Sequence, residues 1–327
     1  MRAARILVAV GAILFAAPAM ADDPLVLETK IPLPDVDGRI DHMAIDLAHK
    51  RLFVAELGND SVGVVDLAHG KVIRTLYHMK EPQGVAYQAE TDTLYVASGL
   101  DGAVRPFVGM TLKPADVIPL GRDADNMRID AKSGLVFVGH STGAVAVIDP
   151  KSRTKQADIP VREHPEGFAL APDGDRIFVN VPDARQVAVL DRTIGKQVAV
   201  WPTNDGHENF PMAFDEASGR ILIVYRRPPQ LDALSPADGK VLANIPTCGD
   251  ADDVFVDQRR NRVYVSCGEG VLDVFQRQGE GYDRLARVLT SSGARTSLFS
   301  DALDRLYVAA RSVNGAPAAL WVFRPTP

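Results

Sequence analysis

The sequence predicts an all-β protein, a seven-bladed β-propeller built from four-stranded blades. A motif of fourteen residues, in which a turn joins two short apolar strands, recurs seven times without internal gaps. Successive copies begin 41 to 44 residues apart, and a period in this range with several short strands per unit is typical of propellers. The copies span residues 41–54, 83–96, 125–138, 166–179, 210–223, 252–265 and 295–308.

The first 21 residues have the pattern of a secretory signal peptide. Arg2 and Arg5 precede an apolar stretch of 12 residues, and the segment ends in an Ala-Met-Ala cleavage pattern. The stretch is too short to span a bilayer. We therefore expect no membrane span and a periplasmic, monomeric protein with one propeller domain over residues 22–327. Cleavage would take the formal charge from −6 to −8, which disfavours nucleic acid as a partner.

Each copy extends to four strands. After the motif comes an alternating apolar segment, such as 61–67 or 144–150, and then a turn and a fourth segment, such as 71–78. The seventh copy stops at its third strand, 319–325, near the C-terminus. We expect residues 24–33 to supply the missing strand, because pairing the two ends of the chain in one blade removes an exposed sheet edge.

The two cysteines, Cys248 and Cys267, flank the paired strands of the sixth copy and fall at the same end of one blade. In an exported protein this arrangement favours a local disulfide over a thiolate metal site. The sequence contains no C-x-x-C-H pattern for covalent haem attachment.

Several repeats resemble the YVTN-type repeats of bacterial propellers, in particular those of YncE-like periplasmic proteins. The resemblance rests on RLFVAELGNDSVGVVDL at 51–67, TLYVASGLDGAV at 93–104 and RIFVNVPDARQVAVLD at 176–191. It implies a binding scaffold, which in some cases carries an enzyme site. A propeller fold does not by itself specify a function.

The repeat register predicts which side chains meet at one mouth of the central channel. The first residue of each copy lies where the chain enters the innermost strand, and the second residue adds further polar groups. The first ring comprises Asp41, Gln83, Asp125, Glu166, Phe210, Asp252 and Arg295, and the second contributes His42, Asn126 and Asp253. A slip of one residue in the fifth copy would bring Asn209 to the mouth instead of Phe210. Loops between second and third strands add Glu56, Asp101, His140, Arg226, Glu269 and Arg311 to this face.

Carboxylates crowded at a channel mouth repel one another unless a cation or an arginine compensates their charge. One hypothesis is a divalent cation held by Asp41, Asp125, Glu166 and Asp252. Ca²⁺ or Mg²⁺ would suit such oxygen ligands, whereas Zn²⁺ would require a histidine to join. Arg128 and Arg295 are the candidate counter-ions. The alternative is that these carboxylates cap strand ends and bind loop amides.

Two classes of function follow. The first is a non-catalytic scaffold whose mouth binds a small ligand or an envelope protein. The second is a metal-assisted hydrolase, lactonase or lyase, in which His42 or His164 would be catalytic. His164 and Glu166 alternate in an extended segment and could act as a base and its partner, as metal ligands, or be ordinary loop residues. No nucleophile elbow or phosphate-binding loop is present in the sequence.

Overall fold

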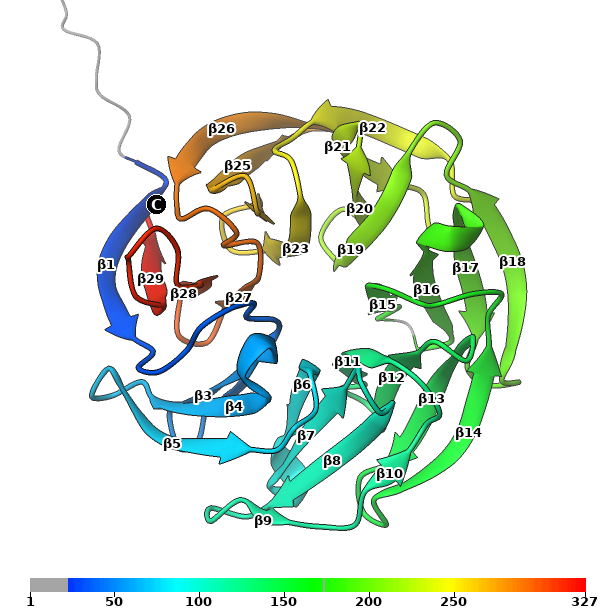
Figure 1. Ribbon diagram of the computed structural model, residues 1–327. Helices are drawn as coiled ribbons and strands as arrows, with labels where there is room; N and C mark the ends of the chain where they lie inside the picture. The colour runs from blue at the N-terminus through cyan, green and yellow to red at the C-terminus, as the bar shows by residue number, and fades with distance from the viewer. Residues whose placement is uncertain (1–22, 173) are drawn as a thin grey trace, which may run out of the picture.

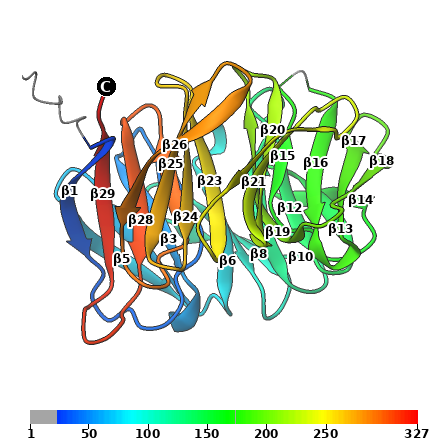
Figure 2. The ribbon, with the colours of Figure 1, turned by 90° about the horizontal axis from the view of Figure 1, so that it is seen from above.

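The computed structural model describes residues 23–172 and 174–327, and the predicted signal peptide lies outside them. Within these ranges the strands form seven antiparallel sheets around a central channel (Figure 1). Figure 2 shows that the ring is a disc whose strands run between its two faces. The predicted seven-bladed β-propeller is confirmed.

Each blade begins at the channel and ends at the outer wall. From the inside outward, the first three blades comprise β2 (Met43–Asp46), β3 (Arg51–Glu56), β4 (Ser61–Asp66) and β5 (Lys71–Tyr77); β6 (Pro82–Gln88), β7 (Thr93–Ser98) and β8 (Ala103–Val108) with the short β9 (Lys113–Pro114) and β10 (Ile118–Pro119); and β11 (Ala124–Ile129), β12 (Val136–His140), β13 (Ala144–Asp149) and β14 (Thr154–Pro160).

The next three blades follow the same order. They comprise β15 (Phe168–Leu170), β16 (Arg176–Val181), β17 (Gln186–Asp191) and β18 (Lys196–Pro202); β19 (His207–Asp215), β20 (Arg220–Arg227), β21 (Pro229–Leu234) and β22 (Val241–Pro246); and β23 (Ala251–Asp257), β24 (Arg262–Cys267), β25 (Val271–Gln278) and β26 (Gly281–Leu289).

The seventh blade joins the two ends of the chain. It consists of β27 (Ser297–Ser300), β28 (Arg305–Ala310), β29 (Ala319–Pro325) and, on the outside, β1 (Leu25–Pro32). β1 pairs antiparallel with β29, with Leu25 opposite Pro325 and Ile31 opposite Leu320. The predicted closure by the N-terminal strand is therefore confirmed.

The apolar core is divided between the blades. Among the described residues, seven clusters of buried apolar side chains each join two neighbouring sheets. The largest fully buried side chains include Phe53, Tyr95, Phe137, Phe178 and Tyr264, which lie at equivalent places in the second strands. The apolar second strand of the motif thus packs each blade against the next.

Among the described residues, three short 3-10 helices lie in the loops: η1 (Leu57–Asn59), η2 (Ala89–Thr91) and η3 (Pro182–Ala184). In the part of the chain that the structure describes, no helix has the length and apolar character needed to cross a membrane.

An acidic residue lies at the end of the first strand of several blades, or directly after it, and shapes the turn that follows. Asp46, Asp130 and Asp257 each accept a hydrogen bond at 3.1 Å from the backbone N–H three residues later. Short side-chain acceptors of this kind replace a backbone partner in a tight turn. These aspartates are therefore structural and lie away from the mouth.

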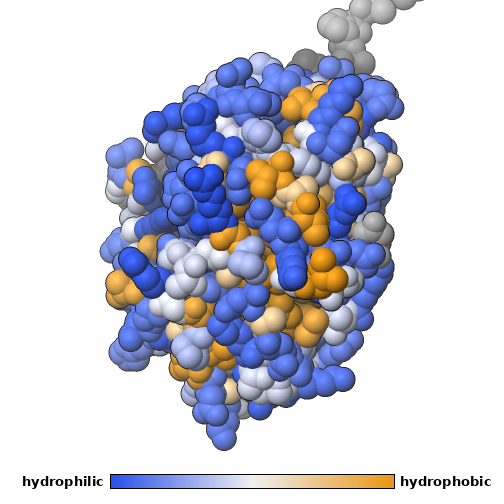
Figure 3. All heavy atoms as spheres, turned by 90° about the vertical axis from the view of Figure 1, so that its right-hand side faces the viewer, coloured by the Kyte–Doolittle hydropathy of each residue, from blue (hydrophilic) through white to orange (hydrophobic). Residues whose placement is uncertain are grey.

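The Sγ atoms of Cys248 and Cys267 are 1.99 Å apart and form a disulfide within the sixth blade. On the outer wall, the fourth strands carry partly exposed apolar side chains, among them Val198 and Val200 of β18. Figure 3, which faces the side that carries β18, shows apolar side chains interrupted by hydrophilic ones.

Candidate functional site

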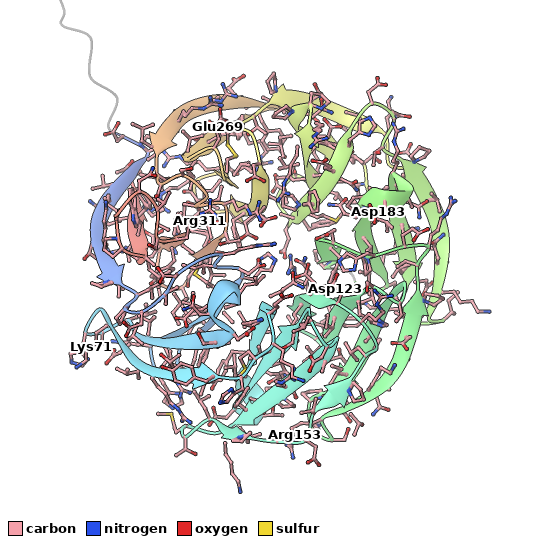
Figure 4. All side chains as sticks on the ribbon, viewed as in Figure 1. Lys71, Asp123, Arg153, Asp183, Glu269 and Arg311 are labelled. Atoms are coloured by element: carbon pink, nitrogen blue, oxygen red, sulfur yellow. A yellow bond between two sulfur atoms is a disulfide. The ribbon has the colours of Figure 1, made fainter. Side chains whose placement is uncertain are left out.

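A polar cavity of about 160 Å³ lies at one mouth of the channel. All seven residues that begin the motif copies line it, together with His42, Asn126 and four residues outside the motif, Arg39, Asp123, His164 and Arg226. Figure 4 shows Asp123 close to the axis, in front of the innermost strands. The cavity therefore collects side chains from all seven blades.

One side of the cavity wall is internally neutralised. Arg39 Nη2 lies 2.8 Å from Asp41 Oδ2. Asp252 is flanked by Arg226, whose Nη2 lies 2.5 Å from Oδ1, and by Arg295, whose Nε lies 3.0 Å from Oδ2. The guanidinium of Arg226 also stacks on Phe210 at 4.0 Å from the ring centroid. Asp41 and Asp252 are thus held by arginines.

The other side brings together Asp125, His164 and Glu166. One ligand atom from each lies within 4.8 Å of the other two. His164 Nε2 is 3.6 Å from Glu166 Oε1, and its Nδ1 is 3.9 Å from Asp123 Oδ2. Among the described residues, neither Asp125 nor Glu166 has a lysine or arginine nitrogen within 4.0 Å. In this half of the wall no described lysine or arginine forms a close ion pair with the acidic groups, although the positive charge of His42 lowers the pKa of Asp125.

The surroundings of Asp125 are incomplete for a carboxylate. Asp125 is 7% exposed, and its Oδ2 accepts a long hydrogen bond of 3.3 Å from Asn126 Nδ2. Its Oδ1 is buried and accepts no hydrogen bond from any described residue. A buried ionised carboxylate is costly unless it is paired or coordinates a cation.

Burial and mutual repulsion raise the pKa values of both carboxyl groups, Asp125 and Glu166. Burial raises the pKa of Asp125 to about 7, and Asp41 and Asp123 contribute to the rise against the effect of His42. Burial also raises the pKa of Glu166 well above its ordinary value, and Asp125 and Asp252 add to it. Burial and repulsion therefore stabilise the neutral form of both groups relative to the ionised form, and a bound cation would act in the opposite direction.

The pKa values of the two histidines at the cavity, His164 and His42, are shifted in opposite directions. Burial lowers the pKa of His164 and outweighs the raising effect of Asp123. Burial alone would also lower the pKa of His42, but Asp253, Asp41 and Asp125 together raise it to about 10. At neutral pH, His164 is a neutral imidazole that can bind a metal, whereas His42 is a cation that can donate a proton.

Three predicted mouth residues lie elsewhere. Asn209 is fully buried, and its Nδ2 donates to Asn180 Oδ1 at 2.9 Å. A register shift in β19 between Asn209 and Met212 turns Phe210 to the cavity instead. Arg128 and Asp253 line the channel below the mouth, because successive residues of an extended strand descend along the axis.

Other residues that the sequence assigned to the mouth also lie partly in the cavity and partly outside it. Gln83 lines the mouth and donates from Nε2 to Asp123 Oδ1 at 2.8 Å. Arg128, a predicted counter-ion for the carboxylates, has no carboxylate oxygen within 4.0 Å among the described residues. Figure 4 shows Glu269 and Arg311 away from the axis, so these two loop residues do not reach the cavity.

Sequence reasoning missed Arg39 and Asp123. Asp123 lies two residues before Asp125, and the alternation of an extended segment could have indicated it. Arg39 belongs to the irregular connection between β1 and β2, where no repeat fixes the register. Arg39 also lies two residues before Asp41, but outside the repeat this spacing did not indicate that the two side chains pair.

Comparison with known proteins supports the fold. No family model matches the sequence, and no curated protein matches it. A solved chain of hydrazine synthase from Kuenenia stuttgartiensis is similar with a TM-score of 0.75 and 17% identity, over 96% of this chain and 99% of that chain. A chain of a mitotic checkpoint complex is similar with a TM-score of 0.79 and 13% identity, over 99% of both chains. Likeness at these identities shows the fold alone.

Proposed function

We propose that this protein is an exported propeller scaffold whose channel mouth binds a small ligand, and that the ligand best matched to the mouth is a divalent cation held by Asp125, His164 and Glu166. The observation that carries the proposal is the buried Oδ1 of Asp125, which has no hydrogen-bond partner among the described residues. A cation between Asp125 and Glu166 would compensate their charge, as the arginines do for Asp41 and Asp252.

The donor set narrows the choice of metal. Two carboxylates and one neutral imidazole favour Zn²⁺ or Mn²⁺ over the Ca²⁺ or Mg²⁺ that four carboxylates would suggest. Asp41 and Asp252 are not needed as ligands, because each already has an arginine nitrogen within 3.0 Å that compensates its charge, although Oδ2 of each accepts no well-aligned hydrogen bond from a described residue.

Thermal unfolding after chelation tests this proposal. Restoring Zn²⁺ or Mn²⁺ at about 100 times its dissociation constant should stabilise the protein by roughly 2.7 kcal/mol. Asp125→Asn should abolish the metal-dependent rise while leaving the metal-free protein about as stable as the parent, since the amide replaces a buried carboxyl group whose pKa burial has already raised.

Asp283→Asn is the matched control for this experiment. It removes one exposed carboxylate from β26, the outermost strand of the sixth blade, and should keep the metal effect. If none of Zn²⁺, Mn²⁺, Ca²⁺ and Mg²⁺ stabilises the parent, the proposed cation site is excluded, and the scaffold proposal then rests on a different small ligand or an envelope protein.

Membership of the YVTN-type, YncE-like propellers and a periplasmic location belong to the same proposal. The repeat phrases and the signal-peptide pattern of residues 1–21 support them. Fractionation of cells that express the full chain tests the location. Recovery of a protein that begins near residue 22 in the periplasmic fraction is expected, and retention of residues 1–21 in the cytoplasm would contradict it.

A second candidate function is a metal-assisted hydrolase, lactonase or lyase. It is favoured by the space in the cavity: three protein ligands leave coordination positions open, as in catalytic rather than structural metal sites. His42, protonated at neutral pH, would serve as the acid. Metal-loaded protein should then hydrolyse simple lactones or esters, and His42→Gln should lower kcat. If the metal-bound protein is inactive, the enzyme function is excluded and only the scaffold function remains.

A further inference from the structure

A second and larger cavity, of about 650 Å³, occupies the channel below the mouth. His42, Asn126 and Asp252 line both cavities and form the partition between them. The lower cavity extends past the ends of the innermost strands to Glu216, Gln258 and Asp301, which lie in the turns on the opposite face. Its volume is in the range that holds a drug-sized molecule.

Apolar and polar side chains contribute comparable shares of the wall of this lower cavity, and the apolar share comes largely from the innermost strands. The fifth residue of successive motif copies contributes Ile45, Tyr87, Ile129, Leu170, Phe214 and Val256. At the fourth position most copies have alanine, and the others have phenylalanine, leucine and one arginine, Arg128. Arg128 is thus the one charged residue in a ring that is otherwise small or apolar.

Arg128 has few partners for a guanidinium in such a place. Its Nη1 donates to the backbone carbonyl of Met127 at 2.8 Å, and its guanidinium lies 5.4 Å from the ring centroid of Phe168. Among the described residues, no carboxylate oxygen lies within 4.0 Å of it. Arg39, Arg226 and Arg295 in the upper cavity each have at least one such partner. A guanidinium offers five donors, and most of those of Arg128 remain free to bind an anion.

We propose that the lower cavity binds a small amphipathic carboxylate, with its carboxylate on Arg128 and its apolar chain along the channel wall toward the opposite face. A planar carboxylate can accept two parallel hydrogen bonds from one guanidinium. A singly charged head group fits better than a phosphate dianion, because Asp252 and Asp253 line the same cavity and would repel additional negative charge.

Titration calorimetry with linear fatty acids tests the inference, on protein treated with chelator so that the result does not depend on the cation site. Octanoate should bind, and affinity should rise about fourfold per methylene group from butanoate to octanoate as the chain covers apolar wall. The uncharged 1-octanol and the cationic octylamine should bind at least about tenfold more weakly than octanoate. Octyl phosphate should also bind more weakly.

Arg128→Met removes the charge and retains an apolar side chain, and should weaken octanoate binding about tenfold or more. Arg128→Lys, which keeps the charge but not the planar fork, should give an intermediate loss and covers the case in which the methionine variant fails to fold. Arg311→Met, an exposed arginine away from the axis, should bind octanoate like the parent. Three results would each overturn the inference. The first is equal binding of octanoate, octanol and octylamine, and the second is unchanged octanoate binding in Arg128→Met. The third is no octanoate binding at about 10 mM, a concentration about ten times a weak dissociation constant of 1 mM.

Discussion

The imidazole Nε2 of His164 lies 3.6 Å from Oε1 of Glu166, and both face the buried carboxylate of Asp125 across the channel mouth. This distance is longer than a hydrogen bond, so the two groups are adjacent without satisfying each other. Three potential ligands thus converge on a place where no described lysine or arginine nitrogen lies within 4.0 Å of the carboxylates of Asp125 and Glu166. On the opposite wall, arginines bind Asp41 and Asp252.

Removing the imidazole should weaken cation binding. We expect His164→Gln to lower the affinity for Zn²⁺ or Mn²⁺ by at least about tenfold, because it replaces a neutral nitrogen ligand by a weaker amide. Calorimetric titration of the chelator-treated protein measures this. His69→Gln, an exposed histidine in a turn of the first blade, is the control, and equal affinities in the two variants would exclude His164 as a ligand.

Breaking the pair between Arg226 and Asp252 should destabilise the mouth. Arg226→Met removes the short contact to Asp252 and the stacking on Phe210, but Arg295 still compensates Asp252. We therefore expect a loss of about 1 to 3 kcal/mol in the free energy of unfolding. Adding Asp252→Asn should restore part of it in urea denaturation. Additive losses in the double variant would show that the two side chains do not interact.

The stability of the protein should depend on pH through His42. Its pKa is raised to about 10 in the folded protein, above that of an unfolded histidine near 6.5. The stabilisation is therefore fully present below about pH 6.5 and is lost as the pH rises toward 10. The difference in unfolding free energy between the parent and His42→Gln should shrink over this window, by at most about 1.4 kcal/mol per pH unit. A constant difference from pH 6.5 to 10 would show that His42 is neutral in the folded state.

The N-terminal strand should contribute to stability through one face. Ile31 is 4% exposed and packs in the cluster between the seventh and first blades, whereas Leu27 of the same strand is 40% exposed. Ile31→Ala should lower the free energy of unfolding by about 2 to 4 kcal/mol, and Leu27→Ala by less than about 1 kcal/mol. Similar losses in denaturant titrations would contradict the pairing register of β1 with β29.

The repeat made the fold and the neighbourhood of the site predictable, because its register fixes which residue of each copy begins the innermost strand. Phe210 and Asp252, which begin copies, line the mouth cavity, and β1 closes the ring. The pairing of charges was not predictable. It depends on Arg39 in an irregular segment and on the bulge in β19, which a repeat pattern does not specify. That Arg128 has no close carboxylate partner could not be predicted either. Contacts across the channel join residues that are far apart in the sequence.

Anomalous diffraction from crystals grown with Zn²⁺ or Mn²⁺, recorded on both sides of the metal absorption edge, tests the central claim most directly. The account predicts one strong anomalous peak at the channel mouth, within about 2.0 to 2.3 Å of oxygens of Asp125 and Glu166 and a nitrogen of His164. An empty mouth at saturating metal, or a cation bound between Asp41 and Asp252 instead, would contradict it.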